Sequence, residues 1–245
     1  MKLNKKIYRI FQNIELVDSI IHVPNYFISS FGIKFLAFFS IPILTRLLTP
    51  AEYGLLNIFG TYAIIISIVF TLNLQSSIFR YYNHKIDLIG SFLFQIITIQ
   101  SFLIILFFLF SLFYEKKISE ILNLPQKTII YLAPVAFLNL SQSWVLYFLK
   151  AQRDSKSYKN YNLIKTLLGF IFTLIFVYLI QEDRYIGKIY SELIGLIFSL
   201  YYVFKILVPK IKVKIDLNQI KFMLGYSIGL IPGYLGVVLL GQIDR

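Results

Sequence analysis

Long apolar runs, separated by short polar clusters, follow one another along almost the whole chain. Two of these runs, residues 102–114 and 167–180, contain no charged residue. A helix that crosses a bilayer needs roughly 20 mostly apolar residues, because each residue rises about 1.5 Å and the hydrocarbon core is about 30 Å thick. The pattern therefore predicts a series of membrane-spanning helices.

Seven segments meet this length requirement, and the sequence ends inside the last of them. We expect an all-α, polytopic membrane helix bundle with six complete transmembrane helices and the start of a seventh. The connections between the segments are short. The predicted spans are residues 26–46, 50–77, 88–114, 128–149, 161–180, 190–208 and 222–243.

The composition agrees with a membrane protein. Hydrophobic residues make up 58% of the chain and charged residues 15%, whereas about a quarter of a soluble domain is charged. The chain has no cysteine, which excludes disulfides and thiolate chemistry. A net charge of +12 would suggest a nucleic-acid partner in a soluble protein, but here it indicates basic loops, so we expect no nucleic acid.

The start of the second predicted span carries a helix-capping signature. Thr49, Pro50 and Glu52 place a hydroxyl at the N-cap, proline at the first helical position and glutamate at the third. We expect a tight turn there, so that the first two spans form an antiparallel hairpin.

Lysine and arginine are unevenly distributed between the two sides of the membrane. The side of the N-terminus carries more than twice as many, and cytoplasmic loops are the basic ones. We therefore expect a cytoplasmic N-terminus. That side holds Lys2, Lys5, Lys6, Arg9, Arg80, Lys85, Lys150, Arg153, Lys156, Lys159, Lys205, Lys210, Lys212, Lys214 and Lys221. The other side holds Arg46, Lys116, Lys117, Lys127, Arg184 and Lys188.

Lys34 lies near the middle of the first predicted span. A lysine there costs roughly 2.5–3.5 kcal/mol on insertion scales, so it needs an anion or water nearby. At 100° per residue, Ser30, Ile41 and Thr45 share its face of the helix. We interpret this face as one that borders a hydrated cavity.

Two other spans carry stripes of neutral polar residues. Such stripes are expected around a hydrated cavity, but hydrogen bonds between packed helices explain them equally well. The stripe of the second span comprises Asn57, Thr61, Thr71 and Gln75, and that of the fourth comprises Asn139, Gln142 and Ser143.

The remaining intramembrane charges have ordinary explanations. Lys165 lies close enough to the cytoplasmic end of its predicted span to extend to the interface. Glu192 follows Lys188 by four residues, which favours an ion pair over a cation-coupling site. Arg46 and Arg80 end the first two spans, where they either anchor the helices at the interface or contact substrate.

The seventh segment is rich in glycine. Gly225, Gly229 and Gly233 repeat at a spacing of four, with Pro232 among them. This spacing allows close helix packing, and proline beside glycine also allows a gating bend at Gly229, Pro232 and Gly233. The sequence leaves both interpretations open.

No catalytic, metal or cofactor signature is present. The two histidines, His22 and His84, are not spaced as a metal pair, and no glycine-rich phosphate loop is followed by lysine and a hydroxyl residue. We therefore predict that the chain is not an enzyme and binds no cofactor.

The run from Arg46 to Asn57, with Thr49-Pro50-Ala51-Glu52-Tyr53-Gly54 at its centre, resembles the first hairpin of polysaccharide-biosynthesis flippases. These are the O-antigen and oligosaccharide lipid flippases of the MATE-like superfamily. Arg80-Tyr81-Tyr82 and the segment 225–232, followed by Asp244-Arg245, are similar to their later landmarks.

The resemblance implies a carrier in the bacterial inner membrane that moves an undecaprenyl-pyrophosphate-linked oligosaccharide to the periplasmic leaflet. It implies the bilayer, the lipid-linked oligosaccharide, and the polymerase and glycosyltransferases of the pathway as partners. Residues 1–23 would form a cytoplasmic amphipathic lead-in, residues 24–210 a six-helix N-terminal transporter lobe, and residues 211–245 a connection and the seventh helix. We assign Lys34, Arg46, Arg80, Gln75 and Asn57 to substrate binding, with Lys34 near the pyrophosphate.

Such carriers have about twice this length, so we expect the chain to be a truncated product rather than a dimerising half-carrier. Two other functions stay open. A MATE-type small-molecule exporter would need acidic residues in its cavity, whereas this sequence offers Lys34. An integral-membrane polysaccharide polymerase would need a long outer loop, whereas the predicted loops are short.

Overall fold

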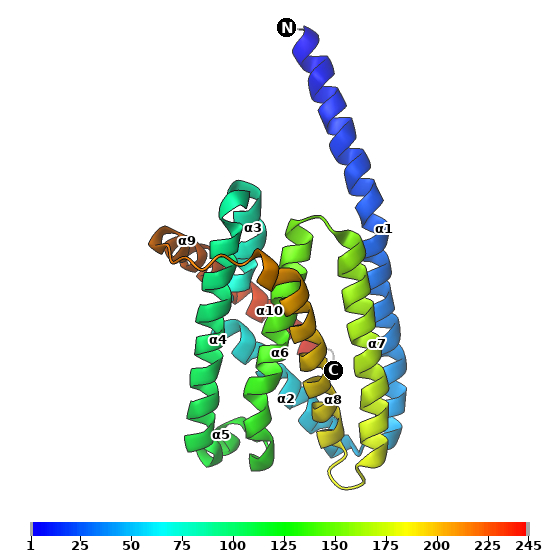
Figure 1. The fold of residues 1–245 in the computed structure, drawn as a ribbon. Coiled ribbons are helices and arrows are strands. Elements are labelled where there is room, and N and C mark those ends of the chain that lie inside the picture. The colour runs from blue at the N-terminus through cyan, green and yellow to red at the C-terminus, as the bar shows by residue number, and fades with distance from the viewer. Residues whose placement is uncertain (1, 244–245) are drawn as a thin grey trace.

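The computed structural model describes the backbone of residues 2–243 and the side chains of residues 22–241. Within these residues the fold is entirely helical, without strands (Figure 1). The helices are α1 (Lys2–Leu47), α2 (Pro50–Val69), α3 (Ser77–His84), α4 (Ile89–Phe113), α5 (Glu115–Leu122), α6 (Gln126–Ala151), α7 (Ser155–Leu179), α8 (Tyr185–Tyr202), α9 (Leu217–Ile228) and α10 (Ile231–Ile243).

Seven of the helical segments are long and apolar enough to cross a membrane, which confirms the predicted fold class. Most boundaries shift by a few residues, and the span containing α7 begins earlier than expected, at Ser155. The spans are His22–Leu47, Pro50–Val69, Ile86–Phe113, Gln126–Ala151, Ser155–Leu179, Tyr185–Lys210 and Leu217–Gly241.

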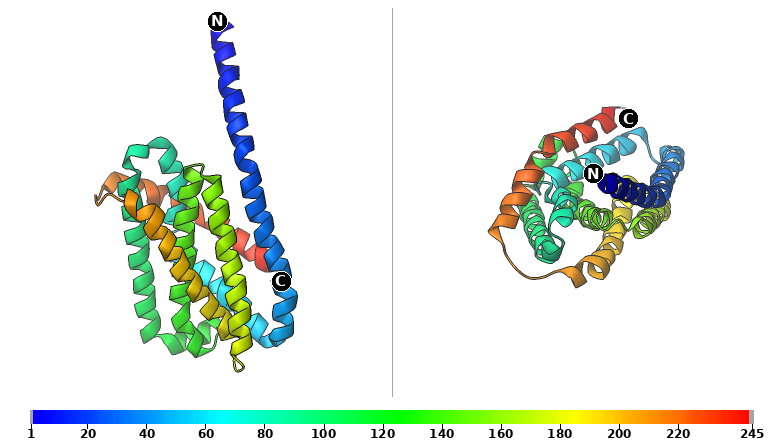
Figure 2. Two further views of the ribbon diagram at one scale, coloured as in Figure 1. Left: turned by 45° about the vertical axis from the view of Figure 1, so that its right-hand side comes forward. Right: turned by 90° about the horizontal axis from the view of Figure 1, so that it is seen from above.

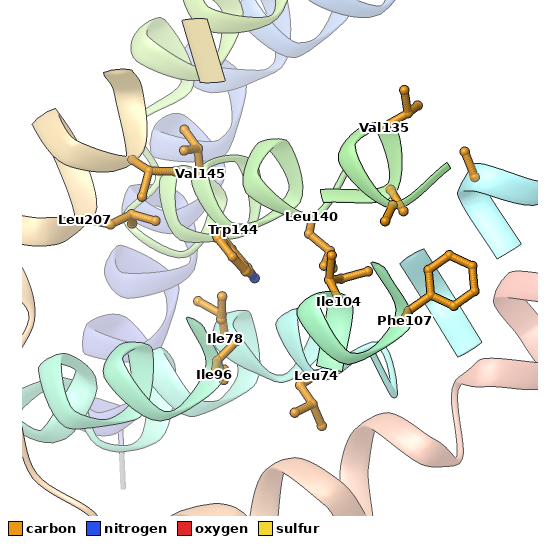
Figure 3. Packing of buried hydrophobic residues seen from close by; sticks show 14 of the residues in the cluster. Leu74, Ile78, Ile96, Ile104, Phe107, Val135, Leu140, Trp144, Val145 and Leu207 are labelled. Atoms are coloured by element: carbon orange, nitrogen blue, oxygen red, sulfur yellow. The ribbon is translucent and has the colours of Figure 1, made fainter. Parts of the chain in front are cut away.

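Helix α6 runs through the centre of the bundle and contacts α2, α3, α4 and α8. Trp144 and Phe148 on α6 are almost fully buried. Figure 3 shows the packing of Leu140 and Trp144 beside Ile104 of α4 and Ile78 of α3. In contrast to α6, the other spans leave most of their surface outside the core, as expected for helices surrounded by lipid.

Helix α1 packs mainly against α7 (Figures 1 and 2). Asn162 of α7 donates a hydrogen bond to Ser29 at 3.2 Å, and Gly32 lets α1 approach Leu163 closely. The capping box at Thr49 and Glu52 is confirmed, so the turn after α1 is tight. However, the expectation of a hairpin does not hold for packing, because α1 and α2 diverge after the turn and make few contacts.

The second predicted span is shorter than expected. Helix α2 ends at Val69, and the chain then turns through two left-handed residues, Leu72 (φ 55°) and Asn73 (φ 49°). A short 3₁₀ helix and α3 follow. The predicted continuous stripe is therefore wrong, because Thr71 and Gln75 lie beyond the end of the helix that carries Asn57.

The basic connections lie at one end of the bundle. The N-terminal part of α1, α3, the turn between α6 and α7, and the segment after α8 share this end in Figure 1. At the other end, Arg184 donates to the Leu47 carbonyl at 2.9 Å, and Lys127 pairs with Asp183. The two groups of connections are separated as the charge distribution predicts. The side chains of Lys2, Lys5, Lys6 and Arg9, and the amphipathic face expected there, lie outside the described side chains.

The seventh segment is divided into α9 and α10 by a turn at residues 229–230. Helix α9 is held to α4 by Gln219, which donates to Ser91 at 2.9 Å and accepts from Gln95. The hydroxyl of Ser76, in the segment after α2, donates a hydrogen bond to the hydroxyl of Ser227 at 3.2 Å. The C-terminal pair Asp244 and Arg245, part of the family resemblance, lies outside the described residues.

Candidate functional site

A polar cavity of ≈ 530 Å³ lies inside the bundle between α1, α2, α6, α7 and α8. Its wall is mostly apolar, but each of the five helices contributes at least one polar side chain. Among the described residues the polar lining comprises Ser40, Tyr53, Asn57, Thr61, Asn139, Gln142, Asn162, Lys165, Thr166, Thr173, Lys188, Ser191 and Glu192.

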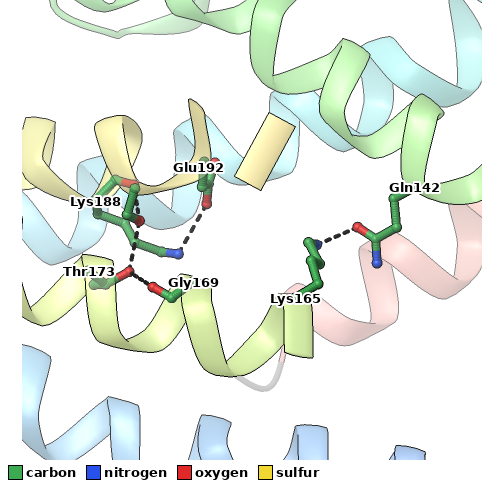
Figure 4. Close-up of polar contacts among 7 residues, drawn as sticks. Gln142, Lys165, Gly169, Thr173, Lys188 and Glu192 are labelled. Carbon is green, nitrogen blue, oxygen red and sulfur yellow. Dashed lines mark hydrogen bonds and ion pairs between the residues drawn. The ribbon is translucent and has the colours of Figure 1, made fainter. Parts of the chain in front are cut away.

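Three charged side chains line the cavity (Figure 4). Lys188 and Glu192 of α8 form an ion pair, with Nζ 3.3 Å from Oε1, as predicted from their spacing. Lys165 of α7 extends toward α6 and donates a hydrogen bond to the side-chain oxygen of Gln142. Because Lys188 and Glu192 neutralise each other, the lining keeps one net positive charge, that of Lys165.

The contact between α7 and α8 positions these charges. Thr173 donates to the Gly169 carbonyl at 2.6 Å, and its hydroxyl lies 2.8 Å from that of Ser191. Gly187 lets the start of α8 cross α7 closely, because a Cβ there would lie 2.7 Å from the backbone of Phe176. The crossing therefore fixes the face that α8 turns toward the cavity.

The position of Lys165 corrects the expectation that it extends to the interface. Helix α7 begins at Ser155 rather than near residue 161, so Lys165 lies about 15 Å along the helix and cannot be treated as terminal. Its stripe is visible in the sequence, because Asn162, Thr166, Gly169 and Thr173 recur at spacings of three and four. This stripe, rather than Lys165 alone, marks the face of α7 that lines the cavity.

The structure brings Asn57 to the cavity but places Lys34 elsewhere. Asn57 lines the wall from α2. Lys34 is exposed on the outer face of α1, beside Phe31 and Phe38, and does not line the cavity. Of its predicted stripe, Ile41 lines the cavity, whereas Lys34 itself does not face the interior of this bundle. The inner face of α1 is the one that carries Ser40.

The other predicted substrate contacts lie apart from the cavity. Arg46 is exposed at the end of α1, and Arg80 is exposed on α3, 5.2 Å from the ring centre of Tyr226. Gln75 is buried and accepts a 2.6 Å hydrogen bond from Gln100 of α4. These residues do not form one site within the described chain.

Gln75 belongs to a buried network that joins three parts of the bundle. Gln100 donates to the Thr71 carbonyl at 3.1 Å, and Trp144 of α6 donates to the side-chain oxygen of Gln100 at 2.6 Å. Gln75 also donates to Asn73 at 2.9 Å. The network satisfies polar groups that the end of α2 leaves inside the membrane.

The glycines of the seventh segment do not mediate close packing in the described chain. A Cβ at Gly225 or Gly233 would meet nothing within 4 Å, and at Gly229 its nearest neighbour would be the Tyr226 carbonyl at 3.9 Å. The predicted bend coincides with the turn between α9 and α10, with Gly229 ending α9 and Pro232 second in α10.

Within the described residues, seven helical segments are long and apolar enough to cross a membrane, and five of the helices line a cavity that carries polar side chains. These features define a multi-pass membrane protein. The chain matches the family model described as polysaccharide biosynthesis protein over residues 25–245. It belongs to this family, which confirms the resemblance found in the sequence. No curated protein and no solved structure matches the chain.

Proposed function

We propose that the chain is the N-terminal lobe of a flippase that moves a lipid-linked oligosaccharide, carried on undecaprenyl pyrophosphate, across the bacterial inner membrane. The observation that carries this proposal is the cavity that membrane-spanning helices line with polar side chains in a member of the polysaccharide biosynthesis family. A cavity with excess positive charge suits an anionic glycolipid, because charges interact more strongly where water is scarce. The N-terminus would be cytoplasmic, since the basic connections lie together at its end of the bundle.

The predicted contacts fall into two groups in this proposal. Asn57 would contact glycan inside the cavity. Lys34, on the outer face of α1, would border a translocation path outside this lobe, where a charged side chain meets water or an anion. Arg46 and Arg80 would contact anionic groups near the two membrane surfaces.

Gln75 would act indirectly, by holding the segment that follows α2. The turn at Gly229, Pro232 and Gly233 would be a gate. This role is compatible with the space around the glycines, because α10 can change direction there without separating tightly packed helices.

Two alternative functions receive less support from the site. A small-molecule exporter for cationic compounds needs a free acidic group, whereas the only carboxylate lining the described cavity, Glu192, is paired with Lys188. A polymerase needs a large outer domain, whereas the connections at the end opposite the basic loops are a two-residue turn, the short helix α5 and a turn at residues 180–184.

The test is export of surface glycan in a bacterial strain that lacks its own flippase but makes the lipid-linked precursor. The gene product is expressed as its source genome encodes it, including any continuation of the reading frame. We expect restored surface glycan, detected by gel and by lectin labelling. Glycan that remains on the cytoplasmic side would contradict the proposal, and export of cationic dyes instead would favour the exporter.

Lys34→Gln tests the role of the outer face of α1 in the same strain. We expect glycan export to fall about tenfold, because a hydrogen bond to a charged group contributes about 1.5–3 kcal/mol. Lys117→Gln, an exposed lysine on α5, serves as the control. Export by Lys34→Gln equal to that of the unchanged protein would remove Lys34 from the path.

A further inference from the structure

We propose that the cavity between α1, α2, α6, α7 and α8 holds an anionic oxygen group, a carboxylate or a phosphate, and that Lys165 is its direct cationic contact. The assignment of this group to the transported glycolipid rests on the proposed function. Binding of the anion itself does not, since it follows from the charges, donors and size of the cavity.

The charge balance around Lys165 carries the first step. Lys188 and Glu192 neutralise each other at 3.3 Å. In the part of the chain that the structure describes, Lys165 forms no ion pair, and its hydrogen-bond partner is the neutral amide of Gln142. A charge held away from bulk water is costly unless an opposite charge accompanies it. The arrangement is therefore incomplete without an anion or a counterion from solvent.

The neutral lining supplies further donors on the same wall. The oxygen of Gln142 accepts from Lys165, so its amide N–H groups are directed elsewhere. The side-chain amides of Asn57 and Asn139 line the cavity and make no hydrogen bond within the described residues. Amide N–H groups bind both anionic oxygens and sugar hydroxyls, so the lining suits an acidic sugar as well as a phosphate.

The size of the cavity is also suitable. Its ≈ 530 Å³ falls within the roughly 300–1,000 Å³ that small-ligand sites occupy. A cation fits the same space poorly, because it would lie near the ammonium groups of Lys165 and Lys188. The only carboxylate on the described wall, Glu192, already has a partner.

The experiment measures binding of defined anions to the full chain in lipid nanodiscs by isothermal titration calorimetry. The probes are glucuronate, inorganic pyrophosphate and, as an uncharged control, galactose. Glucuronate binding indicates an acidic-sugar site, pyrophosphate binding indicates a site for the lipid diphosphate, and either supports the proposal. Failure of both anions to bind, or galactose binding as well as glucuronate, overturns it.

Three variants locate the contact. Lys165→Gln should weaken binding of the anion about tenfold or more, because it removes a charge-assisted hydrogen bond. Glu192→Gln should strengthen binding several-fold, because it releases Lys188 to act as a second cation. A variant that merely damages the fold cannot strengthen binding. Lys156→Gln, an exposed lysine near the start of α7, should leave binding unchanged.

Folding of each variant is checked by size-exclusion chromatography and circular dichroism. If Lys165→Gln folds and binds the anion as tightly as the unchanged chain, the proposal is overturned. If Lys165→Gln does not fold, a Glu192→Gln variant with unchanged or weaker anion binding overturns it. If the unchanged protein binds an anion but exports no glycan, only the proposed function is contradicted. If it exports glycan but binds neither anion, only the anion site is contradicted.

Discussion

Single polar residues within the membrane-spanning helices divide into those that line the cavity and those that join helices. Their presence is evident from the sequence, but their partners are not. Asn57 and Gln75 lie on one predicted stripe, yet Asn57 lines the cavity and Gln75 is buried against Gln100. The difference arises because α2 ends at Val69, and no proline or glycine in the sequence marks that end. Tertiary hydrogen bonds, rather than local propensity, stabilise the break.

Gln100→Leu tests the buried network at the residue scale. It removes the acceptor of Trp144 and the donor to Gln75, which leaves buried polar groups unpaired. We expect the free energy of unfolding to fall by about 1–3 kcal/mol, measured by unfolding in sodium dodecyl sulfate. Gln126→Leu, at the exposed start of α6, should have little effect. Equal stability of the two variants would show that the network contributes nothing.

Whole helices were predicted better than their packing. The sequence reveals seven apolar segments and the capping box before α2, since both depend on residues close together in the chain. It does not reveal that α1 packs on α7 rather than on α2, because that choice depends on contacts between distant segments. Nor does it distinguish glycines at close contacts from those in open positions. Gly187 belongs to the first kind and Gly54 to the second.

Gly187→Ala and Gly54→Ala should therefore have opposite effects. The added methyl group at Gly187 would lie 2.7 Å from the backbone of Phe176, so α7 and α8 must move apart. We expect the free energy of unfolding to fall by about 1–3 kcal/mol. At Gly54 the methyl group meets nothing within 4 Å. Because alanine has the higher helix propensity, we expect the free energy of unfolding to rise by at most about 1 kcal/mol. The same unfolding assay compares them. A destabilised Gly54→Ala would mean that this face of α2 contacts something beyond the described chain.

At the scale of the whole molecule, the uneven charge distribution predicts which connections lie together, and the structure agrees with that grouping. The two agree because each membrane-spanning helix takes the chain to the opposite side. The side of every connection therefore depends on the number of helices before it and not on how the helices pack. The orientation relative to the cell remains a prediction from the positive charges. The absence of cysteine makes this prediction simple to test, because a single introduced thiol has no background.

Lys156→Cys and Lys117→Cys place thiols in exposed positions at opposite ends of the bundle. In intact cells, we expect a membrane-impermeant maleimide to label Lys117→Cys and not Lys156→Cys. Both should react after the membrane is permeabilised, which provides the control for accessibility. Labelling of Lys156→Cys in intact cells, without labelling of Lys117→Cys, would reverse the proposed orientation.

The pairing of α1 with α7 has a consequence for biosynthesis. The ribosome completes α1 at Leu47 long before it completes α7 at Leu179. At about 5–20 residues per second the delay is roughly 7–26 s. During this delay Asn162, the partner of Ser29, has not yet been synthesised. During this time α1 lies in the membrane without α7, in contact with lipid or with the insertion machinery. Helix α1 can complete its side of the cavity wall only after α7 has been synthesised, so its final placement depends on the timing of translation.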